Sequence, residues 1–179
     1  MRLRLVSRSR DQEYVQSFRQ AFTDSEGADE GDLIAGLVED LLSGTAPNDI
    51  YAIAAEAHGT LIAGCVFTRL RFENDTREIF LLSPVAVVPT AQGTGVGQTM
   101  IGHGLSLMRE AGVDVAMTYG DPNFYNKVGF QPVSEADAMA PFPLRQPEGW
   151  LGLALKDKSW SPLKGRSTCV PALANPVFW

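Results

Sequence analysis

Apolar residues recur at helical spacing in two segments near the start of the chain, 11–22 and 33–42. Apolar side chains at every third or fourth position form one face of a helix, so this pattern predicts two amphipathic helices. The stretch between them, 24–31, is rich in small and acidic residues and is expected to be a loop. Gly44 is typical of a residue that ends a helix.

Alternating or continuous apolar residues predict strands elsewhere in the chain. The segments that show such a pattern over the length of an ordinary strand are 3–7, 50–57, 61–72, 78–88, 113–118, 130–133 and 150–155. His58 and Gly59 are typical of a tight hairpin turn between the second and the third. Pro84 has no N–H to donate within the fourth, which we therefore expect to be bulged or bent.

Helical spacing returns directly after the fourth predicted strand, over residues 96–108. A helix between two consecutive strands is typical of a parallel crossover. Gly102 and Gly104 lie inside this helix and cost about 1 kcal/mol each relative to Ala, which close packing onto the sheet would offset. A shorter helix is expected at 123–128.

Together these elements predict the α/β fold class, with a mixed sheet flanked by helices. The 179 residues suit one compact domain. We expect that domain over 1–179, with a core of about 1–156 and a C-terminal extension of about 157–179 that shows no clear period.

Composition narrows the function classes. The net charge of −6 argues against nucleic acid as a partner, because binding it requires clustered Lys and Arg. No apolar run approaches the roughly 20 residues that span a membrane. Cys65 and Cys169 form no CxxC pair, so a reducing cytoplasm is expected. His58 and His103 belong to no spaced ligand cluster, so we expect no metal and a structural role for both.

Three glycines at alternate positions, Gly93, Gly95 and Gly97, separate the fourth strand from the crossover helix. Glycine permits unusual backbone angles and close approach of a ligand to backbone N–H groups. The first N–H groups of the following helix have no partner within it, and they lie at the positive end of the helix dipole. The stretch therefore predicts an anion site, most simply for a phosphate.

The glycines alone fit several chemistries. The phosphate loop of nucleotide hydrolases requires Lys after its last glycine, where this chain has Gln98. A dinucleotide fingerprint starting at Gly93 requires glycine at the position of Gln98, although Asp114 lies at a suitable distance for a ribose contact. A turn that binds no ligand is the third possibility.

A second motif distinguishes these possibilities. Gln92, Gly95 and Gly97 form Q-x-x-G-x-G behind the apolar run 85–89, and the sequence FYNKVGF follows at 124–130. This ordered pair resembles the GNAT superfamily of acetyl-CoA-dependent N-acetyltransferases, in an uncharacterised bacterial-type branch. The resemblance covers about 51–131. It implies a GNAT-like mixed, centrally split β-sheet flanked by helices, with the pantetheine of acetyl-CoA between the separated strands.

The resemblance also implies roles for the residues that match the motifs. Val87 and Val88 are expected to contact pantetheine through their backbone, and one N–H there to polarise the thioester carbonyl. The diphosphate is expected on the helix N-terminus, held by Gln92, Gly93, Thr94, Gly95, Val96 and Gly97. Asn123 is expected to hydrogen-bond the pantetheine chain or, alternatively, to cap the short helix.

Acetyl transfer requires an acid that protonates the departing thiolate, and Tyr125 occupies the family's position for it. The alternative is a tyrosine that only packs in the short helix. The base that deprotonates the amine matches no motif residue. Glu78 is the candidate for this base, while Glu56, Glu73 and a water relay stay open.

The expected function is N-acetyl transfer from acetyl-CoA, as cosubstrate, to a primary amine of a small molecule or peptide. A homodimer is left open. The aromatic residues of the C-terminal part are interpreted as packing rather than as walls of an acceptor cavity; they are Phe142, Trp150, Trp160, Phe178 and Trp179. The rival functions are a non-catalytic module that senses acyl-CoA and a nucleotide-binding protein.

Overall fold

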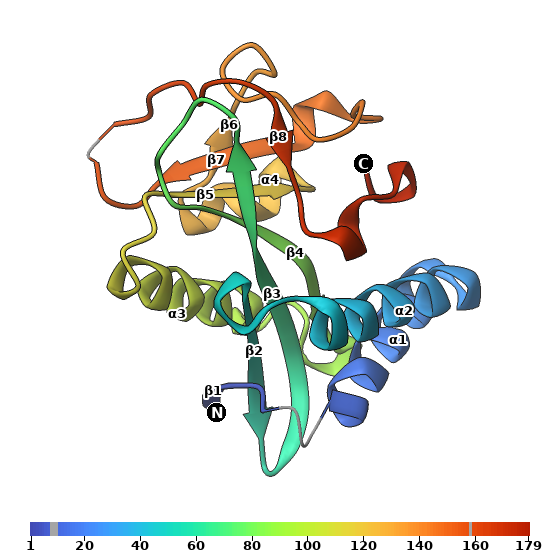
Figure 1. Cartoon of the computed structure of the whole chain (residues 1–179). Coiled ribbons are helices and arrows are strands. Elements are labelled where there is room, and N and C mark those ends of the chain that lie inside the picture. Colours follow the sequence, from blue (N-terminus) through green and yellow to red (C-terminus); the bar gives the residue numbers. More distant parts are fainter. Residues whose placement is uncertain (8–10, 158) are drawn as a thin grey trace. The chain divides into compact units, whose positions relative to one another are not determined.

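The computed structural model describes residues 1–7, 11–157 and 159–179. The chain divides into two compact units. The first contains Met1–Phe67 and Pro84–Gly104, and the second contains Thr68–Ser83 and Leu105–Trp179. Figure 1 traces the elements in chain order. The expected C-terminal extension belongs to the second unit, and the expectation of one domain over 1–179 stays a prediction.

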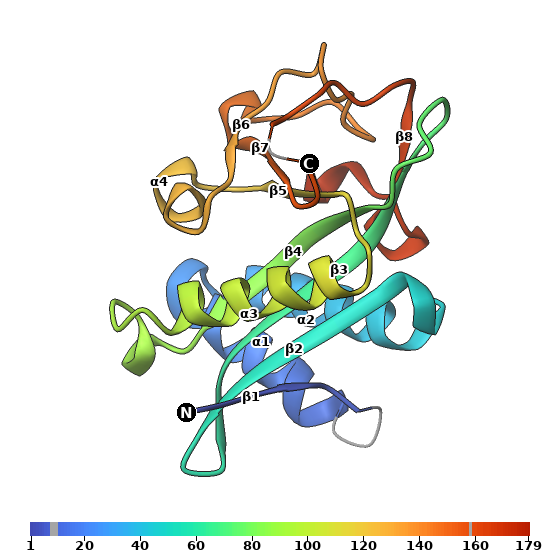
Figure 2. The same ribbon diagram turned by 90° about the vertical axis from the view of Figure 1, so that its left-hand side faces the viewer.

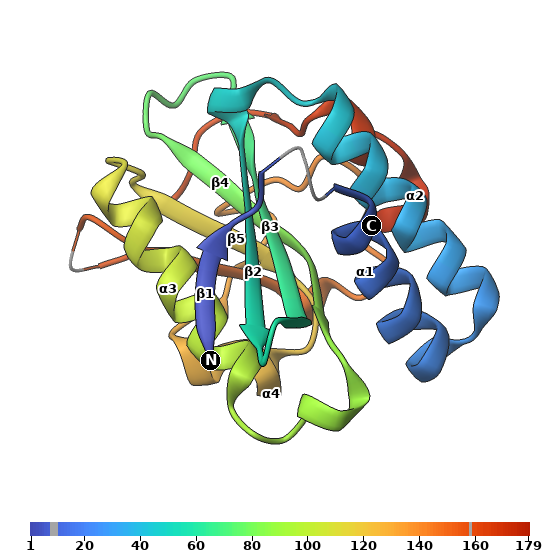
Figure 3. The same cartoon turned by 90° about the horizontal axis from the view of Figure 1, so that it is seen from below.

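The first unit combines strands with a helix pair. Strand β1 (Arg2–Leu5) is antiparallel to β2 (Ile50–Ala57), with Leu3 opposite Ala55. In Figure 3, α3 lies on one side of these strands and the α1 and α2 pair on the other. The remaining elements that contribute to this unit are α1 (Asp11–Glu26), α2 (Ala28–Gly44), η2 (Pro47–Asp49), β3 (Thr60–Phe72), β4 (Ile79–Val87), η3 (Pro89–Ala91) and α3 (Val96–Glu110).

Two glycines allow both helical layers to pack directly on the strands. A Cβ on Gly64 of β3 would lie 2.6 Å from the Phe18 ring of α1. A Cβ on Gly104 of α3 would lie 2.5 Å from the Phe67 ring. Both distances are well below van der Waals contact, so only glycine fits without rearrangement. The expectation of close packing is confirmed for Gly104 and wrong for Gly102, whose Cβ would meet no atom within 4 Å.

Tyr14 fixes α1 on the sheet by a polar contact inside the core. Its hydroxyl donates to the carbonyls of Ile53, at 2.9 Å, and Cys65, at 2.8 Å. The ring is fully buried. Burial raises the pKa of the Tyr14 phenol well above its ordinary value, so the group stays a neutral donor. One side chain thereby joins α1 to β2 and β3.

The predicted loop at 24–31 is wrong. Helix α1 continues to Glu26 and α2 begins at Ala28, so that Gly27 alone separates them, with a φ of 102°. Asp29 and Glu30 lie in the first turn of α2, where negative charge is favourable next to the positive end of the helix dipole. Their acidic character therefore marks a helix start rather than a loop.

The second unit is built on the parallel pairing of β4 with β5 (Val115–Tyr119), which extends from Ile79 and Val115 to Leu82 and Thr118. This confirms the predicted parallel crossover. Strand β5 is antiparallel to β7 (Trp150–Ala154), and β7 is antiparallel to β6 (Gln131–Pro132). The fold class is confirmed as mixed α/β.

The segment after β7 is anchored to the start of the second unit. Its strand β8 (Ser167–Thr168) pairs antiparallel with the end of β3. Arg77 donates to the Asp75 carboxylate at 2.6 Å, to the Ser161 hydroxyl at 2.7 Å and to the Pro162 carbonyl at 2.6 Å. The hydrogen bond from Arg77 lowers the pKa of Asp75 to about 2. The other short helices of this unit are α4 (Pro122–Tyr125), η4 (Asn126–Val128), η5 (Pro147–Gly149), η6 (Pro171–Leu173) and η7 (Pro176–Phe178).

Candidate active site

The glycine loop of the first unit leads into α3 through two residues in the left-handed region. Gly93 has a φ of 73° and Gly95 a φ of 83°. A Cβ on either would meet no atom within 4 Å, so space does not require glycine there. The backbone conformation does require glycine, because these positive φ angles destabilise a residue with a side chain by roughly 1–2 kcal/mol. The loop therefore owes its shape to positive φ angles.

Helix α3 presents its first backbone amides at the end of this loop. The Thr99 N–H donates to the Gly95 carbonyl at 3.0 Å, which forms the first turn. The amides of Val96, Gly97 and Gln98 precede that bond and have no acceptor within the helix. No acidic residue lies in the first turn. The N-terminus of α3 is therefore suited to an anion.

Side chains of the loop bond to its own backbone. Gln92 donates from Nε2 to the Val87 carbonyl at 2.9 Å. The Thr94 hydroxyl donates to the Ala91 carbonyl at 2.6 Å. These contacts connect the loop to the end of β4 and to η3. Gln92 thus acts on the loop itself, which the sequence motif did not indicate.

The strand end before the loop is paired on one side. The Val88 N–H donates to the Ile62 carbonyl of β3 at 3.0 Å. Backbone groups of successive residues in a strand point to opposite edges. The N–H groups of Val87 and, two residues earlier, of Val85 therefore point away from β3. This distinguishes Val87 from Val88, which the sequence treated alike.

In the second unit, Tyr125 ends the short helix α4 that follows β5 (Figure 2). The tyrosine is only 8% exposed. Its ring makes edge contacts with Phe124, at 5.0 Å between centroids, and with Phe130, at 5.8 Å. A Cβ on Gly120 would lie 2.7 Å from its Cε2 atom. Packing therefore fixes the ring from several sides.

Asn123 is not the cap of α4. Asp121 holds that position, and its Oδ1 accepts from the Asn123 N–H at 2.9 Å. The Asn123 side chain is exposed. The capping alternative for Asn123 is therefore wrong, and its expected contact with pantetheine stays a prediction.

Glu78 lies far from Tyr125 within the second unit. Its carboxylate pairs with the Arg69 guanidinium, and its backbone N–H donates to the Asp114 carboxylate, next to the start of β5. Tyr125 follows the other end of that strand. The five residues of β5, at about 3.3 Å each, separate the two ends by roughly 16 Å.

The other candidate carboxylates, Glu56 and Glu73, differ in burial, and His58 lies in a turn. The Glu56 carboxylate is buried and accepts from Arg4 Nε at 2.7 Å. Glu73 is exposed. His58 has a φ of 52° in the predicted hairpin turn between β2 and β3. In the part of the chain that the structure describes, no group of three or more His, Cys, Asp or Glu side chains is arranged to hold a metal ion.

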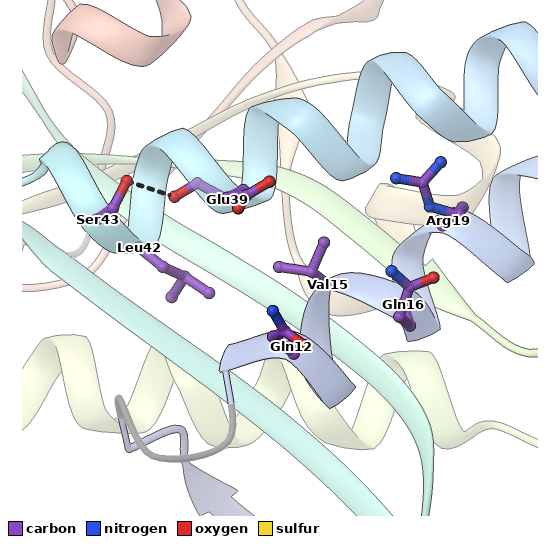
Figure 4. Close-up of a pocket in the computed structure, with 7 residues that line it drawn as sticks. All are labelled: Gln12, Val15, Gln16, Arg19, Glu39, Leu42 and Ser43. Carbon is purple, nitrogen blue, oxygen red and sulfur yellow. Dashed lines mark hydrogen bonds between the residues drawn. The ribbon is translucent and has the colours of Figure 1, made fainter.

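A groove of about 230 Å³ lies between α1 and α2 (Figure 4). Gln12 and Gln16 of α1 and Glu39 and Ser43 of α2 contribute polar side chains. The Ser43 hydroxyl donates to the Glu39 backbone carbonyl at 2.8 Å. None of the residues that match the sequence motifs lines this groove, so we assign it no part in the reaction.

Comparison with known proteins identifies the family. Residues 2–133 match the family model described as an acetyltransferase (GNAT) domain. The chain belongs to the GNAT acetyltransferase family. The GNAT resemblance of the two motifs is thereby confirmed, since the matched range contains both.

Relatives of the GNAT chain include an uncharacterised N-acetyltransferase of Escherichia coli K12, YjhQ, which is 31% identical over 118 residues. That alignment covers 64% of this chain and 63% of YjhQ. A second E. coli K12 relative, YhbS, is 25% identical over 51% of this chain and 54% of its own length. The chain thus spans less than two thirds of these curated relatives.

Solved structures share the GNAT fold. A GNAT family acetyltransferase from Brucella melitensis, in complex with acetyl-CoA, has a TM-score of 0.72 at 22% identity, with 96% of each chain covered. E. coli YhbS, in complex with CoA, has a TM-score of 0.79 at 20% identity, with 97% of this chain and 92% of YhbS covered. At these identities the likeness shows the fold alone.

Other features bear on the remaining expectations. Within residues 1–7, 11–157 and 159–179, no helix is both long enough and apolar enough to cross a membrane.

Trp150 and Trp179 are buried, and their rings lie 6.0 Å apart. The Trp179 ring also lies 6.3 Å from that of Phe142. Packing is therefore confirmed for these three aromatic residues.

Proposed function

We propose that this GNAT protein transfers the acetyl group of acetyl-CoA to a primary amine of a small molecule or peptide. The observation that carries the proposal is the N-terminus of α3 behind the loop of Gly93 and Gly95, within the range that matches the family. The diphosphate of acetyl-CoA binds the amides of Val96 to Gln98. Because Gln92 brings no positive charge, backbone amides supply most of this binding.

Pantetheine binds along the edge of β4 that faces away from β3. The backbone groups of Val87 and Val85 face that edge, whereas the Val88 N–H is engaged by Ile62. One N–H of the Val85 and Val87 pair polarises the thioester carbonyl as it becomes an oxyanion. The register of β4 with β5 ends at Leu82 and Thr118, before Val85, which supports the split sheet that the resemblance implies. Asn123 contacts the pantetheine chain.

The transfer is a direct attack in a ternary complex. The unprotonated amine forms a bond to the thioester carbonyl carbon, and the C–S bond breaks with its electron pair on sulfur. The Tyr125 hydroxyl donates its proton to that thiolate. The amide product loses the extra proton of the attacking nitrogen to a base. A tyrosine hydroxyl carries a proton that it can donate in a hydrogen bond, which suits it to this role.

The base is better assigned to water than to Glu78. The Glu78 carboxylate pairs with Arg69, at the end of β5 opposite to Tyr125. We therefore propose that water carries the amine proton away.

Buried Cys65 and half-buried Cys169 are free thiols, which supports a reducing cytoplasm as the location.

The test is the variant Tyr125→Phe, assayed for thiol release from acetyl-CoA with polyamines, amino sugars and peptide N-termini as acceptors. We expect kcat to fall about 100-fold, as is usual when an acid is removed, while acetyl-CoA affinity stays within threefold. An unchanged kcat would refute the acid assignment. Tight acetyl-CoA binding without thiol release for any amine would instead indicate a sensor.

A further inference from the structure

The link between β5 and α4 contains a glycine whose surroundings leave no room for a side chain. A Cβ on Gly120 would lie 2.7 Å from Tyr125 Cε2, where ordinary contacts are 3.4 to 4 Å. The φ of Gly120 does not lie in the left-handed region. Backbone conformation therefore does not require glycine at this position, but the contact with the tyrosine ring does.

The Gly120 peptide is also enclosed by a second glycine. Its N–H donates to the Gly149 carbonyl at 3.0 Å. A Cβ on Gly149 would lie 2.8 Å from the Gly120 oxygen and 3.4 Å from the Gly120 nitrogen. A side chain on Gly120 would therefore meet the Tyr125 ring, and a side chain on Gly149 would meet the Gly120 peptide.

The neighbouring residue, Tyr119, is held in place by three contacts. Its hydroxyl accepts from the Gln146 N–H at 2.8 Å, its ring stacks on Trp179 at 6.3 Å with an interplanar angle of 14°, and its backbone is in register with Trp150. The peptide that supports the Tyr125 ring therefore has little freedom to move away from an added side chain.

We infer that Gly120 and Gly149 are positioning residues for Tyr125: together they allow the phenol ring to lie directly on the backbone at the end of β5. This inference rests on the proposed role of Tyr125 as the acid. A methyl group on Gly120 would force the ring to move by about 0.7 Å or more to reach ordinary contact. Displacements of about 1 Å in a reacting group can cost roughly 100-fold in rate.

The experiment compares Gly120→Ala with Gly36→Ala, in the full chain. Gly36 lies on the exposed side of α2, and its Cβ would meet no atom within 4 Å. We expect Gly120→Ala to lower kcat about 10- to 100-fold, with acetyl-CoA affinity within threefold, and Gly36→Ala to leave both unchanged.

The double variant Gly120→Ala with Tyr125→Phe separates positioning from general damage. If Gly120 acts through the phenol, the double variant is no slower than Tyr125→Phe alone. If the double variant shows the rate losses of both single variants combined, the inference about Gly120 is wrong, while the acid role of Tyr125 stands. If Tyr125→Phe alone has no effect, the acid assignment fails instead.

A crystal structure of Gly120→Ala supplies a readout that needs no acceptor. We expect a displaced Tyr125 ring, with the hydrogen bond from Gly120 to Gly149 retained. A ring in its original place would contradict the positioning role, whatever the activity. Gly149→Ala is the companion variant, since its methyl group meets backbone and must shift the Gly120 peptide.

Discussion

The glycine loop before α3 and the end of β5 before α4 both depend on glycine, but for opposite physical reasons. Gly93 and Gly95 have positive φ angles and open space around the missing Cβ. Gly120 lacks a left-handed φ and is crowded by the Tyr125 ring. In the loop, glycine sets the direction of backbone amides. At the strand end, it allows a side chain to approach the backbone.

This difference predicts different kinetic consequences. Substitutions in the loop change how acetyl-CoA is held, because the backbone amides are the binding groups. Substitutions at the end of β5 change where a reacting side chain lies, so they lower kcat. The following changes test the separation, in order of decreasing expected effect.

Removing the ring that supports Tyr119 should have the largest effect. Trp179 is 2% exposed, its Nε1 donates to the Leu173 carbonyl at 2.9 Å, and it stacks on Tyr119. We expect Trp179→Ala to lower the free energy of unfolding by about 3–5 kcal/mol and to lower kcat. Denaturant melts and steady-state kinetics measure both. Trp179→Phe is the control and should retain most of the stability.

A change in the loop should affect affinity instead. Gly95→Ala imposes a side chain on a φ of 83°, at a cost of roughly 1–2 kcal/mol. We expect acetyl-CoA affinity to fall about 10-fold, with kcat at saturating acetyl-CoA within threefold. Calorimetry with CoA measures the affinity. A large loss in kcat with unchanged affinity would break the distinction between the two regions.

A change distant in sequence from both motifs should affect stability alone. Asp75 accepts from Arg77 and from the Lys164 N–H. We expect Asp75→Asn to lower the free energy of unfolding by about 1 kcal/mol at neutral pH, with kcat and acetyl-CoA affinity unchanged.

The difference in the free energy of unfolding between the wild type and Asp75→Asn should change with pH in one direction. The pKa of Asp75 is lowered to about 2, below the value near 3.9 of an unfolded chain. Its contribution is therefore fully present above about pH 4 and is lost as pH falls towards 2. Melts of the wild type and Asp75→Asn should converge over that range. A stability difference between the two proteins that stays constant down to pH 2 would contradict the role of the charged carboxylate.

The smallest effect is expected for Gln92→Ala. The substitution removes one hydrogen bond between the loop and the Val87 carbonyl. A single neutral hydrogen bond contributes about 0.5–1.5 kcal/mol, and this one is exposed, so acetyl-CoA affinity should fall only about twofold to threefold. Gln92→Glu is the informative partner, because it keeps the size but loses the donor and adds negative charge beside the diphosphate site. It should bind CoA less tightly than Gln92→Ala.

Much of the fold was predictable because its signals are local. Strand β2 was predicted with its observed bounds, and the crossover helix was placed between the two parallel strands. The errors have physical causes. Acidic residues at the start of α2 resembled a loop, and the two residues of β8 are too short to show a period. Their pairing with β3 depends on residues far away in the sequence.

The sequence by itself determined the family and the residue types of the candidate site. The glycine spacing and the FYNKVGF segment are local patterns, whose meaning follows from backbone conformation and motif order. Only the tertiary structure decided which groups are engaged. It engaged the Val88 amide with Ile62, paired Glu78 with Arg69, and brought Gly120 against the Tyr125 ring. Each of these depends on packing and pairing between segments, which a local pattern does not encode.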